Sequence, residues 1–521
     1  MEQRLYSISL TQDFSKKDLY IQGDYSIISN QSINQSINQS INQSINQSTY
    51  LTDFVKLEKD KTLNFFTYFN AFSLKKWLRY TSINHLYLKL YTRGKFELTL
   101  YGHNKGNKKL HSITSIIIDK EYQTISLDIK ELSSFDVIGF SLQCLSDEGY
   151  FFSGEYWGNF STWKNKKIGI VICTYKREQY ITKNIKFLSK FITQNSWLNV
   201  LVVDNGKTLP IKDTPQFQII HNENYGGSGG FTRGIIEYLE KPSQDYVLLM
   251  DDDIEIELSS LERTHSLING LVEKYNSNFI SGAMLRIENP TIQYENKAYW
   301  NKFRIFNIGK EMDLSLVKNL SINEGVILHP NIYAAWWYCA IPLNQIRNNG
   351  LPLPIFLKGD DMEYGIRNNK EVISLNGISV WHQSFESKYS PIVNYYSDRN
   401  SLIINHFASG CNFLTFFIAV MARLVKRLLK GNLLSLKMYA MALADYHSGL
   451  ESITRIGSDE YMQRVISYSK ENITWKVIPY VIYISLKVLI FYQRDHKKYR
   501  LFRDKYLKEK YFWKKFLKME K

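Results

Sequence analysis

Cysteine is scarce in this chain, and its spacing limits what the protein can be. Only four cysteines occur among 521 residues, and none belongs to a CxxC or CxxH spacing. Neither a zinc site nor a disulfide framework is therefore indicated, and a reducing cytoplasm is the simplest setting. The first residues, MEQRLYSISLTQDF, also lack a basic start followed by an apolar core, so we expect no secretory signal.

Positive charge is in excess but unevenly distributed. The formal net charge is +15, and residues 493–521 hold 12 Lys or Arg against 4 Asp or Glu. Such an excess is typical of proteins that bind nucleic acid or an anionic membrane surface. No RNP, helix-turn-helix or zinc-finger pattern occurs, so we expect no nucleic acid as a partner and favour the membrane.

The N-terminal part of the chain has the pattern of a β-rich domain. Between about residues 50 and 160, stretches such as HLYLKLYTRGKFELTLYG alternate apolar and polar residues, as half-buried strands do. Residues 29–48 repeat Ser, Ile, Asn and Gln and contain too few apolar side chains to fold. We predict an antiparallel β-sandwich over residues 1–165, with a disordered insert at 29–48.

The middle of the chain changes to the pattern of an α/β domain. Continuous apolar runs in KKIGIVICTYKRE, WLNVLVVDNG and DYVLLMDDD alternate with helix-like segments and end in polar loops. Such runs indicate buried parallel strands, and ligands of parallel sheets lie at the carboxyl ends of the strands. We predict an α/β domain with a parallel sheet over residues 166–405.

The last part, residues 406–521, is predicted to be helical. In FLTFFIAVMARLVKRLLK the basic residues fall on one helical face, namely Arg423, Lys426, Arg427 and Lys430. A second apolar segment, 477–492, is shorter than the ~20 residues of a membrane span. Two interpretations stay open, an interfacial membrane attachment and a core of bundle helices, and the basic tail favours the first.

Three adjacent acids in LLMDDDIEIE, Asp251, Asp252 and Asp253, are the strongest chemical signal. On an extended strand, side chains two residues apart point the same way, so Asp251 and Asp253 can bind one hard cation. Mg²⁺ and Mn²⁺ use few protein carboxylates and complete their shell with water and phosphate oxygens, which suggests a nucleotide diphosphate. The alternative is a solvated acidic turn.

Further motifs follow the other apolar runs. The loop NYGGSGGFTRG allows either close backbone approach to an anionic ligand or merely a tight turn, and its glycines are Gly226, Gly227, Gly229 and Gly230. In PLPIFLKGDDMEYGIR, a carboxylate of Asp360, Asp361 or Glu363 could accept a proton from a substrate hydroxyl, or these acids could cap a helix.

Two aromatic stretches complete the set of candidates. His382 ends the strand-like run GISVWH and is a candidate third metal ligand, which as a nitrogen donor would favour Mn²⁺ over Mg²⁺. Its alternative is an ordinary polar or core histidine. Trp336 and Trp337 in AAWWYCAIP are either core residues or a platform for a sugar ring.

Taken in order, VICTYKRE, VVDNG, NENYGGSGGFTR, LLMDDDIEIE, WWYCAIP, PLPIFLKGDDMEYGIR and VWH resemble the motifs of family 2 glycosyltransferases of GT-A fold. The similarity is greatest to the polymerising UDP-galactofuranose transferases. It covers about residues 166–405, and the order of sandwich, GT-A domain and helical C-terminus also resembles that branch. The resemblance implies an inverting transfer of galactofuranose from UDP-galactofuranose to a hydroxyl of a glycan or glycolipid.

The resemblance also implies roles for matched residues. Asp251, Asp253 and His382 would hold Mn²⁺ or Mg²⁺, with Mn²⁺ preferred, and Asp361 would be the general base. The residues expected to contact the nucleotide sugar are Thr174, Arg177, Asp204, Asn224, Gly227 and Asp252. Those expected to contact the donor or acceptor sugar are Trp336, Trp337, Asp360 and Glu363.

One departure concerns the acceptor. Near YYSDRN the family has a histidine linked with acceptor recognition, where this chain has Ser397 and Asp398. This departure leaves the acceptor, its linkage and any polymerising behaviour open. Because the motifs do not settle the donor, one alternative is another nucleotide sugar, such as UDP-galactose, UDP-glucose or dTDP-rhamnose. A second alternative is a non-catalytic glycan-binding protein. We expect a cytoplasmic protein attached to the inner face of the cell membrane, with a homo-oligomer as an open possibility.

Overall fold

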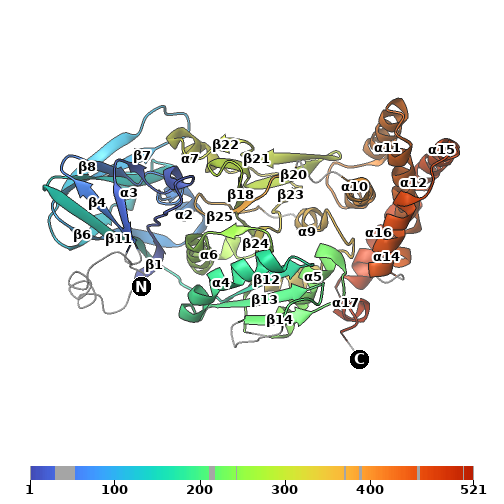
Figure 1. Ribbon diagram of the computed structural model, residues 1–521, viewed down its shortest axis with the longest axis horizontal. Helices are drawn as coiled ribbons and strands as arrows, with labels where there is room; N and C mark the ends of the chain where they lie inside the picture. The colour runs from blue at the N-terminus through green and yellow to red at the C-terminus, as the bar shows by residue number, and fades with distance from the viewer. Residues whose placement is uncertain are drawn as a thin grey trace.

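The computed structural model describes residues 2–29, 53–210, 217–241, 243–368, 371–385, 390–454, 458–508 and 510–519. The molecule is elongated, with a β-sandwich at one end, α/β sheets in the middle and a group of helices at the other end (Figure 1). The three regions follow one another in the expected order. The exact borders after residues 165 and 405 stay predictions. Apart from Ser29, the repeat at 29–48 lies outside the described residues.

The N-terminal region consists of two antiparallel sheets. In the first, the strand order is β3-β4-β11-β6-β9, with β1 also pairing with β11. Its strands are β1 (Glu2–Ser7), β3 (Ser26–Ser29), β4 (Asp53–Glu58), β6 (Ile83–Arg93), β9 (Tyr122–Leu127) and β11 (Glu148–Phe160). The second sheet has the order β2-β5-β10-β7-β8. Its strands are β2 (Gln22–Gly23), β5 (Thr62–Asn64), β7 (Phe96–His103), β8 (His111–Ile118) and β10 (Val137–Cys144).

The alternating pattern places one face of each sheet in a shared core. Along β6, Leu86, Leu88 and Leu90 are buried, whereas intervening Lys89 is only partly covered. This is the period of two that the sequence showed. Two short helices close this region, α2 (Leu74–Tyr80) and α3 (Ile129–Leu132). The predicted antiparallel sandwich is confirmed.

The central sheet has the order β14-β13-β12-β15-β24-β17. Its first four strands are parallel, and β24 joins antiparallel. The strands are β12 (Ile168–Thr174), β13 (Leu198–Asp204), β14 (Phe217–His221), β15 (Tyr246–Asp251), β17 (Ile280–Ser281) and β24 (Tyr338–Pro342). Helices α4 (Glu178–Gln194), α5 (Gly226–Glu240), α6 (Leu258–Gly270) and α8 (Leu343–Asn349) connect or follow these strands. The predicted α/β fold is confirmed.

Two smaller sheets stand beside the central one. One has the order β16-β25-β18-β19-β22 and the other β21-β20-β23. Their strands are β16 (Glu255–Ile256), β18 (Ala283–Arg286), β19 (Ile292–Glu295), β20 (Lys297–Asn301), β21 (Arg304–Ile308), β22 (Met312–Asp313), β23 (Ile332–Tyr333) and β25 (Ser379–His382). Helices α7 (Val317–Asn323) and α9 (Asp360–Asn368) lie in the same region.

The sandwich and the α/β region are joined by buried charges. Lys76 of α2 forms an ion pair with Glu324 at 3.2 Å, with both side chains 2% exposed. Arg263 of α6 is buried, with its guanidinium carbon 3.8 Å from the ring centroid of Tyr6. Because such groups are costly to expose singly, we infer that this interface stays closed in the folded protein.

The C-terminal region is helical, as predicted. Its helices are α10 (Pro391–Asn405), α11 (Phe413–Leu429), α12 (Leu433–Ser448), α13 (Leu450–Thr454), α14 (Ser458–Lys470), α15 (Val477–Ile490), α16 (Tyr492–Tyr506) and α17 (Lys510–Phe516). Within the described residues, no single helix has the length and apolar character needed to cross a membrane. Helices α15 and α16 together have that length and apolar character, but the pair is bent by 69°.

Two details of the predicted basic features differ in the structure. The cations of α11 do not share one solvent-facing side, because Arg423 and Arg427 both turn towards Asp398 of α10, while Lys426 and Lys430 are exposed. The basic tail is also part of the core. Trp513 of α17 is fully buried and donates its indole N–H to the Pro352 carbonyl oxygen at 3.1 Å.

Candidate functional site

The polar ends of neighbouring parallel strands meet at one edge of the central sheet. Thr174 pairs in register with Asp204 across β12 and β13, and Cys173 pairs with Asp251 across β12 and β15. Three motifs that are far apart in sequence are therefore adjacent in space. This is the edge at which parallel α/β sheets bind their ligands.

Asp251, Asp253 and His382 form the one group of potential metal ligands found among the described residues. One ligand atom from each lies within 4.8 Å of the others. The arrangement follows from strand pairing, because β16 begins two residues after Asp253 and pairs antiparallel with β25, which His382 ends. The His382 Nε2 atom lies 3.0 Å from the Asp253 Oδ1 atom. Two carboxylates and one imidazole match the donor set expected for a divalent cation.

The hydrogen bonds of His382 orient it for this role. Its Nδ1–H donates to the Gln383 carbonyl oxygen at 2.5 Å, which leaves Nε2 directed at the aspartates. Burial lowers the pKa of His382, but the hydrogen bond and charge of Asp253 outweigh it, so the pKa is raised overall. A cation at Nε2 would replace the proton that this raised pKa retains.

Asp252 lies outside the group of potential metal ligands and is held by other partners. Its carboxylate accepts hydrogen bonds from Thr174 Oγ1 at 2.7 Å and from Arg177 Nη1 at 3.0 Å. Arg177 also contacts Asp253 Oδ2 at 2.7 Å, and its side chain is 41% exposed. Thr174 and Arg177, both predicted to contact the nucleotide sugar, thus lie directly beside the metal-ligand candidates.

The second acidic motif begins helix α9 close to the first. Asp360 and Asp361 lie in its first turn, and Asp361 Oδ1 accepts the Met362 N–H at 2.7 Å. A Cβ atom on Gly227, in the first turn of α5, would lie 3.3 Å from Asp360 Oδ2. The glycine loop therefore brings the N-terminal end of α5 against this carboxylate, where the helix dipole favours negative charge.

The loop before α9 is held in an unusual conformation. Phe356 and Lys358 have φ angles of 69° and 65°, in the left-handed region that such residues rarely adopt. Asn400 of α10 fixes this loop by donating to the carbonyl oxygens of Leu357 at 2.8 Å and Lys358 at 2.7 Å. Backbone strain of this kind is commonly found where a side chain must be placed accurately, here Asp361.

Negative charge at the site exceeds the nearby positive charge. Burial raises the pKa of Asp251 and of Asp361 to about 6 each. Burial, together with the charge of Asp361, raises the pKa of Asp360 to about 7. A cation bound among these carboxylates would offset part of their mutual repulsion. Such a cation would account for the crowding of acids in LLMDDDIEIE.

Glu363, predicted to orient the acceptor, has its carboxylate engaged elsewhere. It is fully buried and pairs with Arg367 in a two-bond arrangement, with Oε1 2.6 Å from Nε and Oε2 3.1 Å from Nη2. Arg367 also donates to the Leu351 carbonyl oxygen at 2.8 Å. In this structure Glu363 therefore fastens α9, and contact with the acceptor stays a prediction.

Asp204 and Asn224 shape the loops around the site. Both are buried, and Asp204 accepts the backbone N–H groups of Gly206, Thr208 and Leu209 at 2.7–2.9 Å. Asn224 Oδ1 accepts the Gly226 N–H at 3.1 Å. Both carboxylate oxygens of Asp204 thus bond to its own loop. Nucleotide contact by either residue remains a prediction.

The two tryptophans are mostly buried. Trp336 is 5% exposed and packs edge-on against Phe231, with ring centroids 5.3 Å apart. Trp337 is 7% exposed, donates its indole N–H to the Gly282 carbonyl oxygen at 3.1 Å and stacks on Phe385. Each ring has a substantial packing role. A sugar contact by either one stays a prediction.

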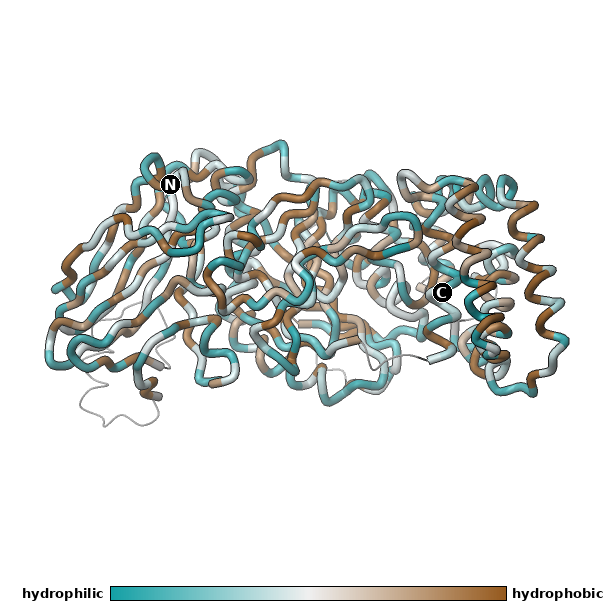
Figure 2. The backbone as a smooth tube through the Cα atoms, turned by 90° about the horizontal axis from the view of Figure 1, so that it is seen from above, coloured by the Kyte–Doolittle hydropathy of each residue, from teal (hydrophilic) through white to brown (hydrophobic). Residues whose placement is uncertain are grey.

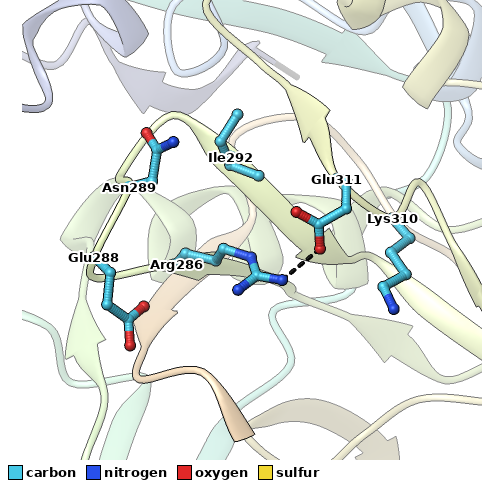
Figure 3. A pocket seen from close by; sticks show the side chains of 6 residues that line it. All are labelled: Arg286, Glu288, Asn289, Ile292, Lys310 and Glu311. Atoms are coloured by element: carbon cyan, nitrogen blue, oxygen red, sulfur yellow. Dashed lines mark hydrogen bonds and ion pairs between the residues drawn. The ribbon is translucent and has the colours of Figure 1, made fainter. Parts of the chain in front are cut away.

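A polar pocket of about 530 Å³ opens beside the metal-ligand candidates, and Figure 3 shows its side chains. Its lining residues are Arg286, Glu288, Asn289, Ile292, Lys310 and Glu311. Arg286 pairs in register with His382 across β18 and β25. Glu288 accepts from the Ser384 backbone N–H at 2.9 Å, two residues after His382. The pocket is thus built on the same strand pair that places the histidine.

Glu295 is a site residue that sequence analysis missed. It ends β19 with a buried side chain, and burial together with the charge of Asp361 raises its pKa to about 8. Nothing in TIQYENKAYW marks it, because the acid becomes unusual only when the sheet brings it near Asp361. The departure at Asp398 also gains a reason, since Asp398 Oδ2 pairs with Arg427 Nη2 at 2.5 Å and joins α10 to α11.

Comparison with protein families supports the resemblance. Residues 169–312 match the family model described as glycosyl transferase family 2. Residues 36–159 match the model described as galactofuranosyltransferase 2 N-terminal. The expected resemblance to family 2 glycosyltransferases of GT-A fold, on the galactofuranosyltransferase branch, is confirmed.

Curated relatives agree with these matches. Galactofuranosyltransferase GlfT2 of Mycolicibacterium smegmatis is 23% identical over 381 residues, covering 67% of this chain and 58% of that protein. GlfT2 of Mycobacterium tuberculosis is 22% identical over 387 residues, covering 67% and 59%. The chain thus spans less than two thirds of the length of these relatives.

Solved structures give a weaker likeness. S. aureus TarS 1-349 in complex with UDP-GlcNAc aligns with a TM-score of 0.35 at 15% identity, covering 64% of this chain and 92% of that one. A mannosyltransferase from Pyrobaculum calidifontis in complex with GDP-Man and Mn²⁺ aligns with a TM-score of 0.30 at 11% identity, covering 63% and 88%. At these TM-scores the likeness carries no weight for function.

Proposed function

We propose that this chain, which carries a family 2 glycosyltransferase domain, is an inverting, metal-dependent galactofuranosyltransferase. Its donor would be UDP-galactofuranose, and its acceptor a hydroxyl of a glycan or lipid-linked glycan. The observation that carries the proposal is the convergence of two acidic motifs. Asp251 and Asp253 meet His382 at the sheet edge, and Asp360 lies close enough to Asp251 for their charges to interact.

The ligand set is suited to a divalent cation. Asp251, Asp253 and His382 would hold the ion, and the imidazole nitrogen favours Mn²⁺ over Mg²⁺. When bound, such an ion supplies positive charge that stabilises the diphosphate leaving group. Arg177, bonded to Asp252 and Asp253, adds a fixed cation at the same edge.

Asp361 would act as the general base. Its carboxylate accepts the proton of the acceptor hydroxyl while that oxygen forms a bond to the anomeric carbon of the sugar. The bond from that carbon to the diphosphate oxygen breaks, and the electron pair leaves with UDP. Because the oxygen attacks from the side opposite UDP, the anomeric configuration inverts. A pKa of about 6 suits this role, since the carboxylate is mostly ionised near neutral pH yet more basic than an ordinary aspartate.

The alternative donors are UDP-galactose, UDP-glucose and dTDP-rhamnose. A panel of these donors and UDP-galactofuranose, tested with purified full-length protein and a galactofuranose-containing acceptor, distinguishes them by nucleotide release and product mass. We expect release only from UDP-galactofuranose, abolished by a chelator and restored best by Mn²⁺. Preferred use of another donor would reject the donor assignment, and turnover in a chelator would reject the metal.

A cytoplasmic setting is part of the proposal. It is supported by the four cysteines, which are all free thiols in the structure. Labelling with a maleimide under denaturing, non-reducing conditions tests this point. Four labelled thiols in protein isolated from cells are expected, and oxidised cysteines would contradict a reducing compartment.

A further inference from the structure

Helix α17 and the residues that follow it have two sides of different character. Lys515 and Lys518 are exposed, whereas Trp513 is fully buried, Leu517 is 3% exposed and Phe516 is half-buried. Hydrophobic and hydrophilic residues alternate in this way along the helices at this end of the molecule (Figure 2). The exposed lysines therefore lie on the outer side of this segment, and its inner side packs against the rest of the protein.

The inner side of α17 contacts the glycine loop, residues 224–230. The ring centroids of Phe516 and Tyr225 lie 4.8 Å apart, and Tyr225 is 3% exposed. A Cβ atom on Gly229 would lie 3.7 Å from Leu517 Cδ2. Figure 1 shows α17 beside α5, the helix that this loop begins. Helix α17 thus packs on a segment that is predicted to contact the nucleotide sugar.

The same helix also contacts the loop before α9, residues 351–359. Trp513 donates its indole N–H to the Pro352 carbonyl oxygen at 3.1 Å. A second contact comes from the turn between α16 and α17, where the Leu351 N–H donates to the Leu507 carbonyl oxygen at 2.9 Å. Because this loop leads to the candidate general base, α17 and its preceding turn contact two segments on which the candidate site depends.

The two loops are also bonded to each other. Ser228 Oγ accepts the Phe356 N–H at 3.0 Å, and the Ser228 N–H donates to the Phe356 carbonyl oxygen at 3.3 Å. A Cβ atom on Gly226 would collide with the same carbonyl oxygen, so only glycine allows this close approach. A shift of one loop would therefore displace the other.

Both loops depend on packing from outside. Glycine lacks a side chain, so a glycine-rich segment has much backbone freedom and little surface of its own to pack. Phe356 keeps its left-handed φ of 69° only where its surroundings fix it. The rings of Trp513 and Phe516 supply a large apolar surface. Helix α17 therefore provides packing that the two loops cannot provide themselves.

We propose that α17 positions the glycine loop for binding of the nucleotide diphosphate. Phe516 acts through Tyr225, and Leu517 through the backbone of the loop, so both are positioning residues. Trp513 anchors the helix to the loop before α9. The identity of the ligand rests on the proposed function, whereas the effect of α17 on the loop does not. Without the ring of Phe516 the loop holds its binding conformation for a smaller fraction of the time, and the affinity falls by that fraction.

Hydrogen exchange measured by mass spectrometry on the full-length protein, without ligand, tests the effect on the loop. In Phe516→Ala, amides of peptides covering residues 222–232 should exchange about ten-fold faster, because the loop opens more often. Phe512→Ala is the matched control. Phe512 is also a half-buried ring of α17, but it packs on Phe502 and Tyr506 of α16, at centroid distances of 5.4 and 5.3 Å. Exchange in the glycine loop should be unchanged in this control.

Calorimetry with UDP in the presence of Mn²⁺ tests the effect on the ligand. Phe516→Ala should bind UDP about ten-fold more weakly, as expected if the competent fraction falls to about one tenth. Phe516→Tyr keeps the ring and should restore the affinity, and Phe512→Ala should bind as the unmodified protein does. With UDP-galactofuranose as the donor, the KM of Phe516→Ala should rise more than its kcat falls. Loss of folded protein alone would lower kcat at constant KM.

The results separate this inference from the proposed function. Unchanged exchange or unchanged UDP affinity in Phe516→Ala overturns the inference. Equal effects of Phe516→Ala and Phe512→Ala also overturn it, because they would indicate a general loosening of α17. Absence of UDP binding by the unmodified protein would instead reject the proposed donor and the ligand of this loop. The exchange measurement would still decide whether α17 positions the loop.

Discussion

The buried acids of the helical bundle and the partly buried acids at the carboxyl edge of the central sheet, the candidate catalytic edge, differ in how their charges are compensated. In the bundle, Asp445 pairs with Arg464 at 2.9 Å and accepts the hydroxyls of Tyr395 at 2.6 Å and Tyr461 at 2.9 Å. Asp495, fully buried, lies 2.7 Å from His447 and 3.0 Å from Arg494. Each bundle acid thus has cations and donors of its own.

At the candidate catalytic edge the acids outnumber their positively charged partners. Asp251, Asp360 and Asp361 have pKa values raised to about 6, 7 and 6 by burial. A folded protein tolerates the cost of burying poorly compensated carboxylates where they have a function. An active site needs acids that are positioned to contact a ligand, so their charges are not fully compensated within the protein. The contrast predicts that substitutions of acids at the sheet edge mainly lower activity, whereas substitutions of acids in the bundle mainly lower stability.

Asp361→Asn should have the largest effect, and on activity. Loss of a general base typically lowers the rate by about 10²–10⁴-fold. Asparagine keeps an oxygen for the Met362 N–H and removes a poorly compensated charge, so the melting temperature at pH 7.5 should stay level or rise. UDP release and differential scanning fluorimetry measure the two effects.

The matched control is Asp119→Asn on the sandwich surface, which should change neither quantity. UDP affinity should also survive Asp361→Asn, because the predicted nucleotide contacts are intact. A variant that turns over normally would remove Asp361 as the base. A variant with a markedly lower melting temperature would contradict the contrast between the regions.

Asp445→Asn should act mainly on stability. Buried Arg399 donates to the Tyr461 hydroxyl at 2.9 Å, and that hydroxyl donates to Asp445 at 2.9 Å. The substitution therefore removes a negative charge that compensates Arg399. Breaking a buried charge pair on one side costs about 3–5 kcal/mol, and the exposed Arg464 places this site at or below the lower end. Urea unfolding measures the loss, with Glu451→Gln of α13 as the control. A free energy of unfolding within about 0.5 kcal/mol of the unmodified protein would show that the bundle acids are not structural.

Glu295→Gln should have its effect in the pH dependence of stability. The folded-state pKa of Glu295, about 8, lies above its ordinary value of 4.5. Between these values the folded protein holds a proton that the unfolded chain has lost, so raising the pH destabilises the fold. The contribution of this proton to the free energy of unfolding is present in full below about pH 4.5. It is lost as the pH rises through about 8, by at most about 1.4 kcal/mol per pH unit.

Melting curves from pH 5 to pH 8 test this prediction. The difference between Glu295→Gln and the unmodified protein should move in favour of the glutamine variant as the pH rises. Glu131→Gln, on an exposed position of α3, serves as the control and should show no such trend. Parallel curves for the glutamine variant and the unmodified protein would contradict a raised pKa at Glu295.

Several features could be predicted from local sequence because their causes are local. The alternation in β6 indicates a half-buried antiparallel strand, and the continuous apolar run of β12 indicates a buried parallel strand. Neither indication requires knowledge of tertiary contacts. Asp251 and Asp253 converge on one site as predicted, although β15 ends at Asp251 and the following bend places Asp253. The pairing of these acids with His382, 129 residues after Asp253, was left open by the local sequence, where His382 was a candidate third ligand at the end of a strand-like run, and the resemblance favoured it.

Other features could not be predicted because their causes are tertiary. Arg423 and Arg427 read as part of an exposed basic face, yet the approach of α10 turns them inward to Asp398. The ion pair that Glu363 forms with Arg367, one helical turn away, was not foreseen, while its contact with the acceptor stays a prediction. Glu295 carried no signal at all. In each case the partner's position, and not the residue's identity, decides the outcome.

The sequence by itself determined the order of the three regions, the strand type in each and the acidic motifs that follow the apolar runs, because these depend on periodicity and on neighbours along the chain. Only the tertiary structure decided which charges are neutralised within the protein and which face outward or towards a ligand. The reason is that burial and the distance between charges are properties of the folded chain, and they set both the pKa of an acid and the exposure of a helix face.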